Sequence, residues 1–520
     1  MLPHFPPLPS NLSFFPPILN MAAQPEDGLF HVMFLPYMAP GHMMPMVDMA
    51  RLFAANGLKV TIITTPSNST TFNHSIDRDF NSGRHISLLI IPFPSAKAGV
   101  PLGCENLSAA PTPEISIKLH HGIGMLEPEI TKLFRNHRPN CIVSDYLFPW
   151  TVDVANELGI PRLAFSGSGF FNLCVSQSIE KYRPHDSISS ETERFVVPGL
   201  PDQVLLTKSQ LPDIVKSTTD FSHLFDKLKE AEKKSFGVLV NSFYELEPAY
   251  ADHFTNVTGI KAWHLGPVSL FNKHTDDKIE RGEKTASKHS CLHWLDSRKP
   301  NSVIYVCFGS LNRFSRDQTL EIACALENSG HSFIWVVGKV VKSNKENVNN
   351  EEEWWLPEGF EDKLKKKGEG MIIKGWAPQV LILEHPAIKG FLTHCGWNSV
   401  LEGVSAGLPM VTWPLFADQF YNEKLVTQVV KFGIPAGNEN WKIWASDDSP
   451  CLSRKHIEIA VRRLMSDKEE EVVEMRKRAG RLAELAKKAM EKCGSSSNDL
   501  SSLLQEIRMY KQIAAEKAAT

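Results

Sequence analysis

Apolar and polar residues follow one another along the chain in blocks that predict alternating strands and helices. Residues 29–35 (LFHVMFL) form a short apolar run that ends at Pro36, as expected of a buried strand. Residues 43–55 carry apolar side chains at helical spacing and stop before Gly57, and residues 59–63 form a β-branched run. A strand, a helix and a second strand in this order predict a βαβ unit with parallel strands.

The same alternation returns along most of the chain. Further strands are predicted at residues 86–91, 141–143, 237–240, 303–308, 333–337, 371–373, 390–393 and 410–412, and further helices at residues 316–328, 467–492 and 500–511. Residues 272–290 are charged and polar, which predicts a weakly ordered interdomain connection, and residues 342–355 predict a surface loop. The pattern therefore predicts an α/β protein with two halves, each built on a parallel sheet.

Composition narrows the class of protein and its partners. The chain has 520 residues and a mass of 58.3 kDa, enough for two or more domains. A formal net charge of -3 gives no basic field, so we expect neither nucleic acid nor stable membrane insertion among its interactions. The nine cysteines are scattered without a CxxC pair, which predicts neither a disulfide framework nor a zinc site and favours a reducing compartment.

The N-terminal residues do not have the pattern of a targeting signal. Residues 1–20 are apolar, but six prolines interrupt them and they contain no Lys or Arg. No other window reaches the roughly 18 apolar residues that a membrane span requires. We therefore expect a flexible extension over residues 1–25, with translation starting at Met1 or at Met21, and a soluble, cytoplasmic protein.

Ligands of open α/β sheets collect outside the carboxyl ends of the strands, so the residues after each strand are the candidates for chemistry. In the second half, residues 394–399 (HCGWNS) follow a predicted strand and lead into a helix, which predicts an anion site of free backbone N–H groups. His394, Asn398 and Ser399 can add side-chain contacts to a phosphate. Ser399-x-x-Glu402 also fits a capping box, and that pattern alone favours capping over ligand contact.

A second candidate phosphate contact is Gly309-Ser310, which follows the strand predicted at residues 303–308. Alone it is a weak signal, because Gly-Ser turns are common after strands. Neither turn matches GxGxxG or GxxxxGK[ST], which disfavours a dinucleotide-binding fold and a P-loop ATPase.

Two residues in the first half suggest acid–base chemistry. His42 lies between the first predicted strand and its helix, and Asp145 follows the apolar run at residues 141–143. A histidine can act as a general base near neutral pH, and a carboxylate can stabilise the imidazolium that forms. Each residue has a simpler interpretation, a histidine at a helix start and a strand-end cap. No GxSxG motif is present, which weighs against an α/β-hydrolase.

A long motif then indicates a family. Residues 376–419 (WAPQVLILEHPAIKGFLTHCGWNSVLEGVSAGLPMVTWPLFADQ) resemble the plant secondary-product glycosyltransferase signature over all of its 44 residues. The GHMMP turn at His42 and the strand end at Asp145 resemble the same family in order and distance. The chain is identified as a member of the plant family 1 UDP-dependent glycosyltransferases, and it resembles most the triterpenoid and flavonoid glucosyltransferases. The resemblance implies a GT-B fold, in which two Rossmann-like domains face each other across a cleft.

The resemblance also implies a division of the chain. The expected parts are a flexible extension (1–25), an N-terminal acceptor-binding domain (26–265), a linker (266–290), a C-terminal UDP-sugar-binding domain (291–492) and a C-terminal helix that packs back on the N-terminal domain (493–520).

Donor-binding roles carry over to the matching residues of the signature and to one turn before it. The residues expected at the uridine are Trp376, Ala377, Gln379 and Glu402, which revises the capping interpretation of Glu402. The residues expected at the diphosphate are Ser310, His394, Asn398 and Ser399. The residues expected at the sugar are Trp397, Asp418 and Gln419, and a glutamine at the last position is similar to glucose-using members.

The family chemistry is inverting and assigns the catalytic roles to the first half. The resemblance implies that His42 takes the proton from an acceptor hydroxyl and that Asp145 stabilises the imidazolium. The resemblance implies UDP-glucose as co-substrate and neither a metal ion nor a cofactor. Donors at a helix N-terminus would then stabilise the charge that grows on departing UDP.

The resemblance further implies a lipophilic acceptor, bound mainly by residues 96–124, 166–182 and 197–214 of the first half. We expect glucose transfer to a hydroxyl or carboxyl of a plant secondary metabolite, with a triterpenoid aglycone or saponin as the leading class. The alternatives are a flavonoid or phenolic acceptor, and UDP-galactose or UDP-glucuronate as donor. A hypothesis of a different class, a non-catalytic nucleotide-sugar binder, is disfavoured because His42 and Asp145 are both present.

Overall fold

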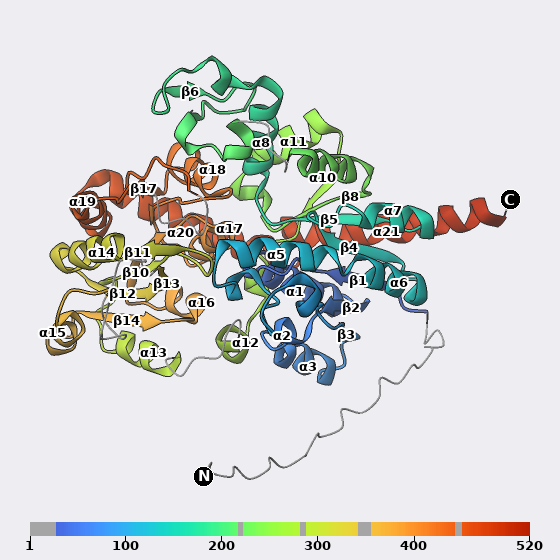
Figure 1. Cartoon of the computed structure of the whole chain (residues 1–520), viewed down its shortest axis with the longest axis horizontal. Coiled ribbons are helices and arrows are strands. Elements are labelled where there is room, and N and C mark those ends of the chain that lie inside the picture. The colour runs from blue at the N-terminus through green and yellow to red at the C-terminus, as the bar shows by residue number, and fades with distance from the viewer. Residues whose placement is uncertain (1–27, 217–221, 281–287, 342–354, 443–449, 520) are drawn as a thin grey trace, which may run out of the picture.

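The computed structural model describes residues 28–216, 222–280, 288–341, 355–442 and 450–519. The predicted extension at residues 1–25 and nearly all of the predicted loop at residues 342–355 lie outside this part. The described elements fall into two α/β halves (Figure 1), one with its sheet in blue to green and one with its sheet in yellow to orange. No helix in the described part is long and apolar enough to cross a membrane.

The first half is built on seven parallel strands in the order β3-β2-β1-β4-β5-β8-β9. The strands are β1 (His31–Leu35), β2 (Lys59–Thr64), β3 (Ile86–Ile90), β4 (Cys141–Asp145), β5 (Arg162–Ser166), β8 (Gly237–Val240) and β9 (Ala262–His264). Val32 and Phe34 of β1 belong to one apolar cluster, and Met33 and Leu35 belong to another. Because both faces of the strand are covered, its sequence is apolar at consecutive positions.

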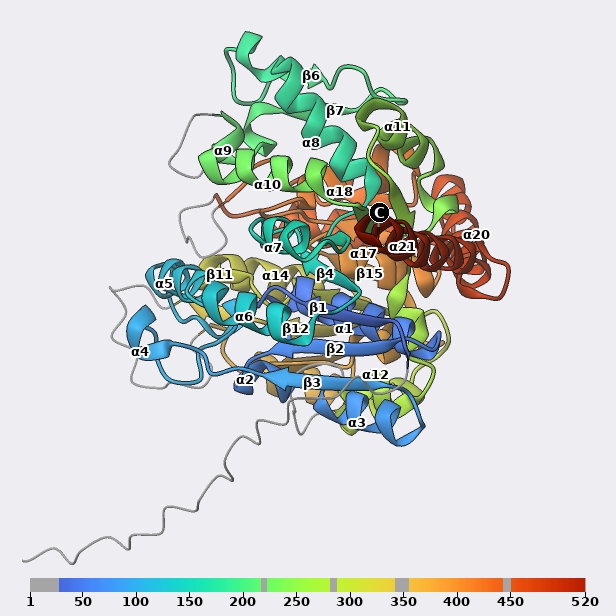
Figure 2. The same cartoon turned by 90° about the vertical axis from the view of Figure 1, so that its right-hand side faces the viewer.

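Helices cover both faces of this sheet. They are α1 (Pro40–Ala55), α2 (Pro66–Ser69), α3 (Asn73–Asn81), α4 (Ser95–Ala98), α5 (Pro113–Gly124), α6 (Glu127–His137), α7 (Thr151–Leu158), α8 (Phe170–Tyr182), α9 (Asp213–Lys216), α10 (Ser222–Lys234) and α11 (Pro248–Thr258). A short hairpin, β6 (Arg194–Val196) and β7 (Leu205–Thr207), is added above α8 (Figure 2). Helix α1 starts three residues earlier than predicted, at a proline that suits the first helical position. His42 therefore lies in the first turn of the helix.

The second half is built on six parallel strands in the order β14-β12-β10-β15-β16-β17. The strands are β10 (Val303–Cys307), β12 (Ser332–Val337), β14 (Gly370–Lys374), β15 (Ile388–Thr393), β16 (Met410–Thr412) and β17 (Gly433–Pro435), with a separate short pair β11 (Arg313–Ser315) and β13 (Lys339–Val341). Its helices are α13 (Lys288–Asp296), α14 (Arg316–Ser329), α15 (Phe360–Lys367), α16 (Gln379–Leu383), α17 (Trp397–Ser405), α18 (Gln419–Lys424), α19 (Arg454–Met465) and α20 (Glu470–Met490).

Every strand predicted from the sequence is present in the described part. The sequence pattern did not indicate several further strands, among them β5, which begins with Arg162. That charged residue is buried, and its guanidinium donates to Ser144 Oγ at 3.1 Å and to the Asp145 carbonyl at 3.2 Å. An arginine can be buried in a strand when its neighbours accept its hydrogen bonds, but in the sequence such a charged residue suggests a loop.

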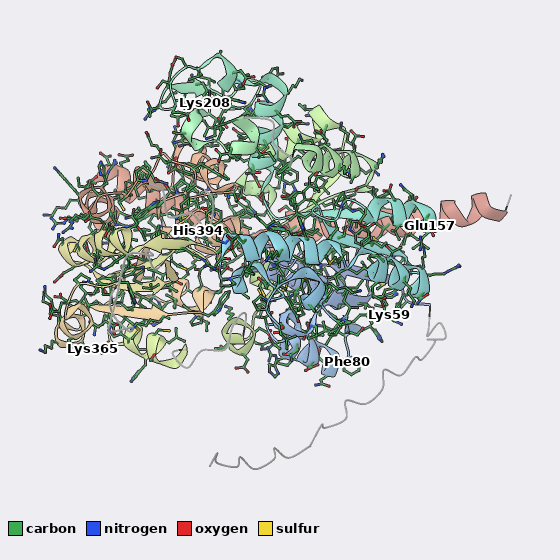
Figure 3. All side chains as sticks on the ribbon, viewed as in Figure 1. Lys59, Phe80, Glu157, Lys208, Lys365 and His394 are labelled. Carbon is green, nitrogen blue, oxygen red and sulfur yellow. The ribbon has the colours of Figure 1, made fainter. Side chains whose placement is uncertain are left out.

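Each sheet contains a point where the order of the strands reverses, and ligands bind at such points. In the first sheet it lies between β1 and β4, which pair in parallel with Leu35 beside Ser144. In the second sheet it lies between β10 and β15, with Cys307 beside Thr393. The candidates that the sequence placed after a strand lie at the carboxyl ends of these four strands, with Asp145 as the last residue of β4. In Figure 3, His394 lies near the middle of the view, between the two halves.

The chain returns to the first half at its end. Helix α20 contacts α17, and α21 (Ser495–Ala519) then packs against β9. Asp499 of α21 accepts hydrogen bonds from His264 N at 2.8 Å and His264 Nδ1 at 3.1 Å, and Ser496 Oγ donates to the Gly266 carbonyl at 2.6 Å. The last helix thus ties the second half to the edge of the first sheet.

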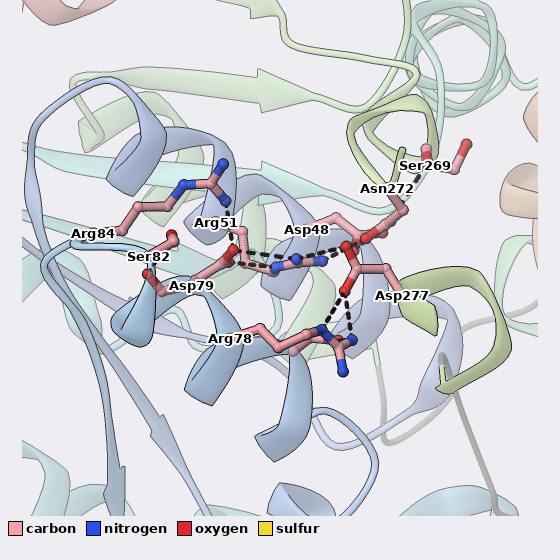
Figure 4. Close-up of polar contacts among 10 residues, drawn as sticks. Asp48, Arg51, Arg78, Asp79, Ser82, Arg84, Ser269, Asn272 and Asp277 are labelled. Carbon is pink, nitrogen blue, oxygen red and sulfur yellow. Dashed lines mark hydrogen bonds and ion pairs between the residues drawn. The ribbon is translucent and has the colours of Figure 1, made fainter. Parts of the chain in front are cut away.

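The predicted weakly ordered connection is wrong for its described part. Residues 275–280 form a helix, α12 (Thr275–Glu280), and Asp277 is buried at 5% exposure. Its carboxylate contacts Arg51 Nη2 at 3.1 Å and also Arg78 (Figure 4), while Arg51 Nε contacts Asp79 at 2.6 Å. Charged residues that look like a solvated linker in the sequence are here neutralised by arginines of α1 and α3.

Helix α12 also contacts the second half. Lys278 Nζ pairs with Glu384 at 2.6 Å, and Glu384 directly follows α16. The neighbouring carboxylate of Asp277 is held by the helix that carries His42. Helix α12 is therefore a strut between the two halves, with one anchor in each.

We expect Asp277→Asn to lower the free energy of unfolding by about 2–4 kcal/mol, because it leaves the buried Arg51 guanidinium with less compensation. The matched control is Asp276→Asn, whose side chain is exposed one residue earlier and which should change stability by less than about 0.5 kcal/mol. Urea unfolding of both variants measures the difference. Equal stability of the two variants would show that the Asp277 carboxylate is not an anchor.

Candidate active site

The candidate base and its carboxylate meet at the switch point of the first sheet. His42 Nδ1 lies 2.8 Å from Asp145 Oδ2. The Asp145 side chain is fully buried, whereas 26% of the His42 side chain is exposed. Asp145 Oδ1 accepts a second hydrogen bond from the Leu147 N–H at 3.0 Å, so both carboxylate oxygens are fixed. With Nδ1 directed at the carboxylate, Nε2 of His42 is the atom that can accept a proton.

Aromatic rings hold the imidazole in this orientation. The Tyr37 ring meets His42 edge-on at a centroid distance of 5.8 Å, and the Tyr146 ring is stacked on it at 6.2 Å. On another side lies Gly167, where a Cβ would be 3.3 Å from the imidazole. Tyr37 in turn hydrogen-bonds His120 of α5. The orientation of the base is thus set by packing as well as by its hydrogen bond.

The surroundings raise the pKa of His42 above its usual value. Burial acts to lower it, but the charge of Asp145 and the hydrogen bond to it outweigh burial, and the charge of Asp418 adds to the increase. Since Asp418 belongs to the second half, this electrostatic contribution crosses the boundary between the halves. A raised pKa makes His42 a stronger base that must first lose its own proton.

In the second half, His394 is enclosed between two glycines. A Cβ on Gly309 or on Gly396 would lie 2.5 Å from His394 Nε2, and Gly309 also has a left-handed φ of +75°. Burial lowers the pKa of His394 to about 4, so the ring is neutral at physiological pH. Its Nδ1 has no hydrogen-bond partner among the described residues. Ser310 directly follows Gly309 in the sequence and is exposed. A phosphate here would meet a neutral imidazole and not a cation.

The capping-box interpretation of Ser399 and Glu402 is wrong. Helix α17 begins at Trp397 with Gly396 as its N-cap, so Ser399 is its third residue and Glu402 its sixth. The backbone before the helix is strained, because Cys395 has a φ of +63° although it is not glycine. This turn places the free N–H groups of the helix start at the carboxyl edge of the sheet, as an anion site requires.

The residues expected at the uridine lie together. Gln379 of α16 donates from Nε2 to Glu402 Oε2 at 2.7 Å and to Ser399 Oγ at 3.2 Å. Trp376 is half-buried and Ala377 is buried just before α16. These hydrogen bonds hold α16 beside α17, although Gln379 and Ser399 are twenty residues apart in the sequence.

The residues expected at the sugar are held by both halves. Asp418 Oδ2 accepts hydrogen bonds from Ser168 Oγ of the first half at 2.6 Å and from Asn422 Nδ2 at 3.0 Å. Burial raises the pKa of Asp418, although these hydrogen bonds and the charge of His42 oppose the increase. Asn422 also donates to the Cys395 carbonyl at 3.0 Å, which links this carboxylate to the strained turn before α17.

Backbone N–H groups shortly before Gln419 hold its side chain in place. Its Oε1 accepts hydrogen bonds from the N–H groups of Leu415 at 2.9 Å and Phe416 at 3.1 Å, and the side chain is only 3% exposed. Its amide NH₂ is therefore the group left for a sugar hydroxyl. The preceding Ala417 has a φ of +53°, a second non-glycine residue in the left-handed region at this site.

Two side chains of α17 reach the first half. Asn398 Nδ2 donates to the Gly41 carbonyl at 2.8 Å, one residue before His42, and Trp397 Nε1 donates to the Asn241 carbonyl at 2.8 Å. The structure thus brings the candidate base and the candidate anion site together. The indole N–H of Trp397 is occupied by protein, which leaves its backbone for a sugar.

Sequence reasoning did not single out Gly41, Ser168, Asn241 and Asn422, although Gly41 lies in the GHMMP turn and Ser168 lies in the expected acceptor segment 166–182. Asn241 directly follows the strand predicted at residues 237–240, so inspection of every strand end would have found it. Ser168 follows β5, which the pattern did not indicate. Phe170 and Phe171, which belong to an expected acceptor segment, are 1% and 0% exposed and form part of the core.

Among the described residues, no group of three or more His, Cys, Asp or Glu side chains is placed to hold a metal ion. The nine cysteines all lie in the described part of the chain, and none of them forms a disulfide there.

Comparisons with known proteins show to which family the chain belongs. The family model described as UDP-glucoronosyl and UDP-glucosyl transferase matches residues 261–475. The UDP-glucose flavonoid 3-O-glucosyltransferase 7 of Fragaria ananassa is 49% identical, over 92% of this chain and 96% of its own. The chain belongs to the plant family 1 UDP-glycosyltransferases. UDP-glucosyl transferase 73CC6 of Saponaria officinalis is 47% identical to this UDP-glycosyltransferase, over 94% of this chain and 98% of its own.

Solved structures show the same fold. UGT73P12 of Glycyrrhiza uralensis, complexed with glycyrrhetinic acid 3-O-monoglucuronide, is 44% identical with a TM-score of 0.89, over 94% of this chain and 98% of its own. UGT71G1 of Medicago truncatula, complexed with UDP-glucose, is 25% identical with a TM-score of 0.73, over 92% of this chain and 98% of its own. The predicted GT-B fold and the predicted glycosyltransferase class of this UDP-glycosyltransferase are confirmed.

The pKa of His42 gives a prediction for the pH dependence of this UDP-glycosyltransferase. A base must be neutral to accept a proton, so kcat/KM should fall as the pH drops through the raised pKa, at a value above 6.5. In Asp145→Asn the upward contributions of Asp145 are lost while burial remains, so this acidic limb should move to lower pH and kcat should fall.

The measurement is kcat/KM for the acceptor between pH 5 and pH 9, with the exposed Asp153→Asn as control in the same half. An acidic limb that stays in place in Asp145→Asn would contradict the assigned pair.

Proposed function

We propose that the protein is a cytoplasmic enzyme that transfers glucose from UDP-glucose, with inversion and without a metal ion, to a hydroxyl or carboxyl of a lipophilic plant secondary metabolite. His42 is the proposed base and Asp145 the proposed partner of its imidazolium. Nucleophilic attack on the anomeric carbon takes place opposite the departing UDP. Holding both substrates between the halves supplies part of the rate through orientation.

The single observation that carries this proposal is the His42–Asp145 pair beside the start of α17. The 2.8 Å hydrogen bond leaves Nε2 available, and the Asn398 amide lies 2.8 Å from the carbonyl of the residue before the base. A proton acceptor in one half and an anion site in the other therefore face the same space. Departing UDP would meet N–H donors and a neutral imidazole, which stabilise charge without reorganising.

The part of the first half next to the base supports a lipophilic acceptor. Helix α5 contributes His120, which hydrogen-bonds Tyr37 beside His42. One turn earlier on the same face of α5, Ile117 is 51% exposed, and Leu102 in the loop before α5 is 95% exposed. An exposed apolar side chain on the helix that contacts Tyr37 suits a hydrophobic substrate.

We favour a triterpenoid aglycone or saponin as the acceptor. Two similar proteins support this choice by name: the Glycyrrhiza structure holds a triterpenoid monoglucuronide, and a soyasapogenol B glucuronide galactosyltransferase of Glycine max is 45% identical. A flavonoid or phenolic acceptor is the alternative, supported by the names of the Fragaria relative and of a scopoletin glucosyltransferase of Nicotiana tabacum at 46% identity. Gln419 at the end of the signature supports glucose over galactose, because a glutamine at this position is similar to glucose-using members.

His42→Ala should lower kcat for transfer by about 10²–10⁴-fold, the usual contribution of a general base, and should leave UDP affinity unchanged. UDP affinity is measured by calorimetry and transfer by UDP release. The control is His74→Ala, an exposed histidine of α3 that should retain wild-type turnover. Wild-type turnover in His42→Ala would reject the assigned base.

A panel of triterpenoid, saponin, flavonoid and simple phenolic acceptors, offered with UDP-glucose, UDP-galactose and UDP-glucuronate, tests the substrate. Mass detection should show a gain of one hexose, with the highest kcat/KM on a triterpenoid or its glycoside. Higher kcat/KM on a flavonoid would move the assignment to the alternative. UDP binding without release of product from any acceptor would favour a non-catalytic binder.

A further inference from the structure

The indole of Trp397 is inserted into the first half of the molecule. Trp397 is the first residue of α17, at the start of the candidate anion site, yet its side chain is only 3% exposed. Its Nε1 donates to the carbonyl of Asn241, the residue after β8, at 2.8 Å. A side chain of the donor half is thus buried in the acceptor half.

The indole lies so close to Gly169 of the first half that no side chain fits on that residue. Gly169 is the N-cap of α8, and a Cβ on it would lie 2.5 Å from Trp397 Cζ2 and 2.6 Å from Cη2. The same Cβ would lie 2.7 Å from Glu247 Oε1. The absence of a side chain at Gly169 therefore creates the space that the far edge of the indole fills.

Glu247 fixes the walls of this space. Its carboxylate is 2% exposed and accepts hydrogen bonds from Ser242 Oγ and, at 2.7 Å, from the Phe171 N–H. Ser242 follows β8 and Phe171 is in the first turn of α8. One buried carboxylate thus joins the two segments that surround the indole, and we call Gly169, Asn241 and Glu247 the tryptophan socket.

The socket also determines where the neighbouring residue of α17 lies. Asn241 Nδ2 donates to Asn398 Oδ1 at 3.4 Å, and Asn398 Nδ2 donates to the Gly41 carbonyl at 2.8 Å. His42 follows Gly41 directly. The seating of Trp397 therefore fixes the start of α17 relative to the base.

We propose that Gly169, Asn241 and Glu247 are positioning residues for the transfer reaction. By receiving the Trp397 indole, these residues set how the two halves lie relative to one another. This inference rests on the proposed function. The three residues touch neither the donor nor the acceptor in this role. They act through Trp397 and Asn398, so their loss should lower kcat much more than it changes UDP affinity.

The first test is Gly169→Ala. The added methyl group must displace the indole, and a small misplacement of reacting groups costs about 10²-fold in rate, so we expect kcat to fall by one to two orders of magnitude. The Kd for UDP should change less than about threefold, because the uridine and diphosphate residues expected to bind it lie in the second half. Gly480→Ala in α20 is the matched control, because no heavy atom lies within 4 Å of its added Cβ. Wild-type kcat in Gly169→Ala would overturn the proposal.

The second test asks whether the effect passes through Trp397. Trp397→Phe removes Cζ2 and Cη2, the two nearest of the three atoms that a Cβ on Gly169 would strike, and leaves Glu247 Oε1. Adding Gly169→Ala to Trp397→Phe should therefore lower kcat by a clearly smaller factor than in the wild type, because only the contact with Glu247 remains. An equal cost in both backgrounds would overturn the proposal, because additivity indicates independent sites.

Asn241→Asp keeps the side-chain oxygen that accepts from the Val268 N–H at 3.0 Å but replaces the donor to Asn398 by an oxygen. It should lower kcat at unchanged UDP affinity and can be measured even if Gly169→Ala does not fold. Wild-type kcat in Asn241→Asp would overturn the proposal. Failure of the wild-type protein to transfer glucose to any acceptor would instead reject the proposed function itself.

Discussion

The hydrogen bond from the Asn398 amide to the Gly41 carbonyl joins the first turns of two helices that belong to different sheets. Helix α1 carries the candidate base, and α17 presents the N–H groups of the candidate anion site. A helix start can serve chemistry only if its polar groups point at the reacting atoms, and here two such starts point at one space. The folding of each half, the strained turn at Cys395 and the strut α12 all contribute to keeping these two turns in register.

The site handles charge without fixed cations. None of the residues expected at the donor is Lys or Arg, and the imidazole of His394 is neutral because burial lowers its pKa to about 4. Attraction for a diphosphate must therefore come from helix dipoles and hydrogen-bond donors. This agrees with a chain whose net charge is only -3. The pKa of His42, the proposed base, is moved in the opposite direction by two carboxylates from different halves.

The sequence was sufficient for the architecture and for the chemical groups, because both depend on local pattern. Apolar periodicity located most strands of the two large sheets, and the residues after the predicted strands included His42, Asp145, Ser310 and His394. The contacts that hold these groups in place depend on residues far apart in the chain. Trp397 and Asn241 are separated by 156 positions, and Arg51 and Asp277 by 226. Periodicity carries no information on such pairs, so a buried carboxylate such as Asp277 looked like part of a solvated linker.

The polar groups at the expected sugar and ribose positions are already paired with one another. The Ser168 hydroxyl donates a hydrogen bond to the Asp418 carboxylate, and the Gln379 amide donates one to the Glu402 carboxylate. A substrate that binds there does not add hydrogen bonds to an empty surface but exchanges partners with groups that are largely satisfied. Such an exchange is nearly neutral in free energy when every hydroxyl finds its place, and costly when one buried carboxylate is left without a donor. Selectivity among sugars that differ only in the direction of one hydroxyl would then arise from the penalty on the wrong sugar, with little gain from the right one.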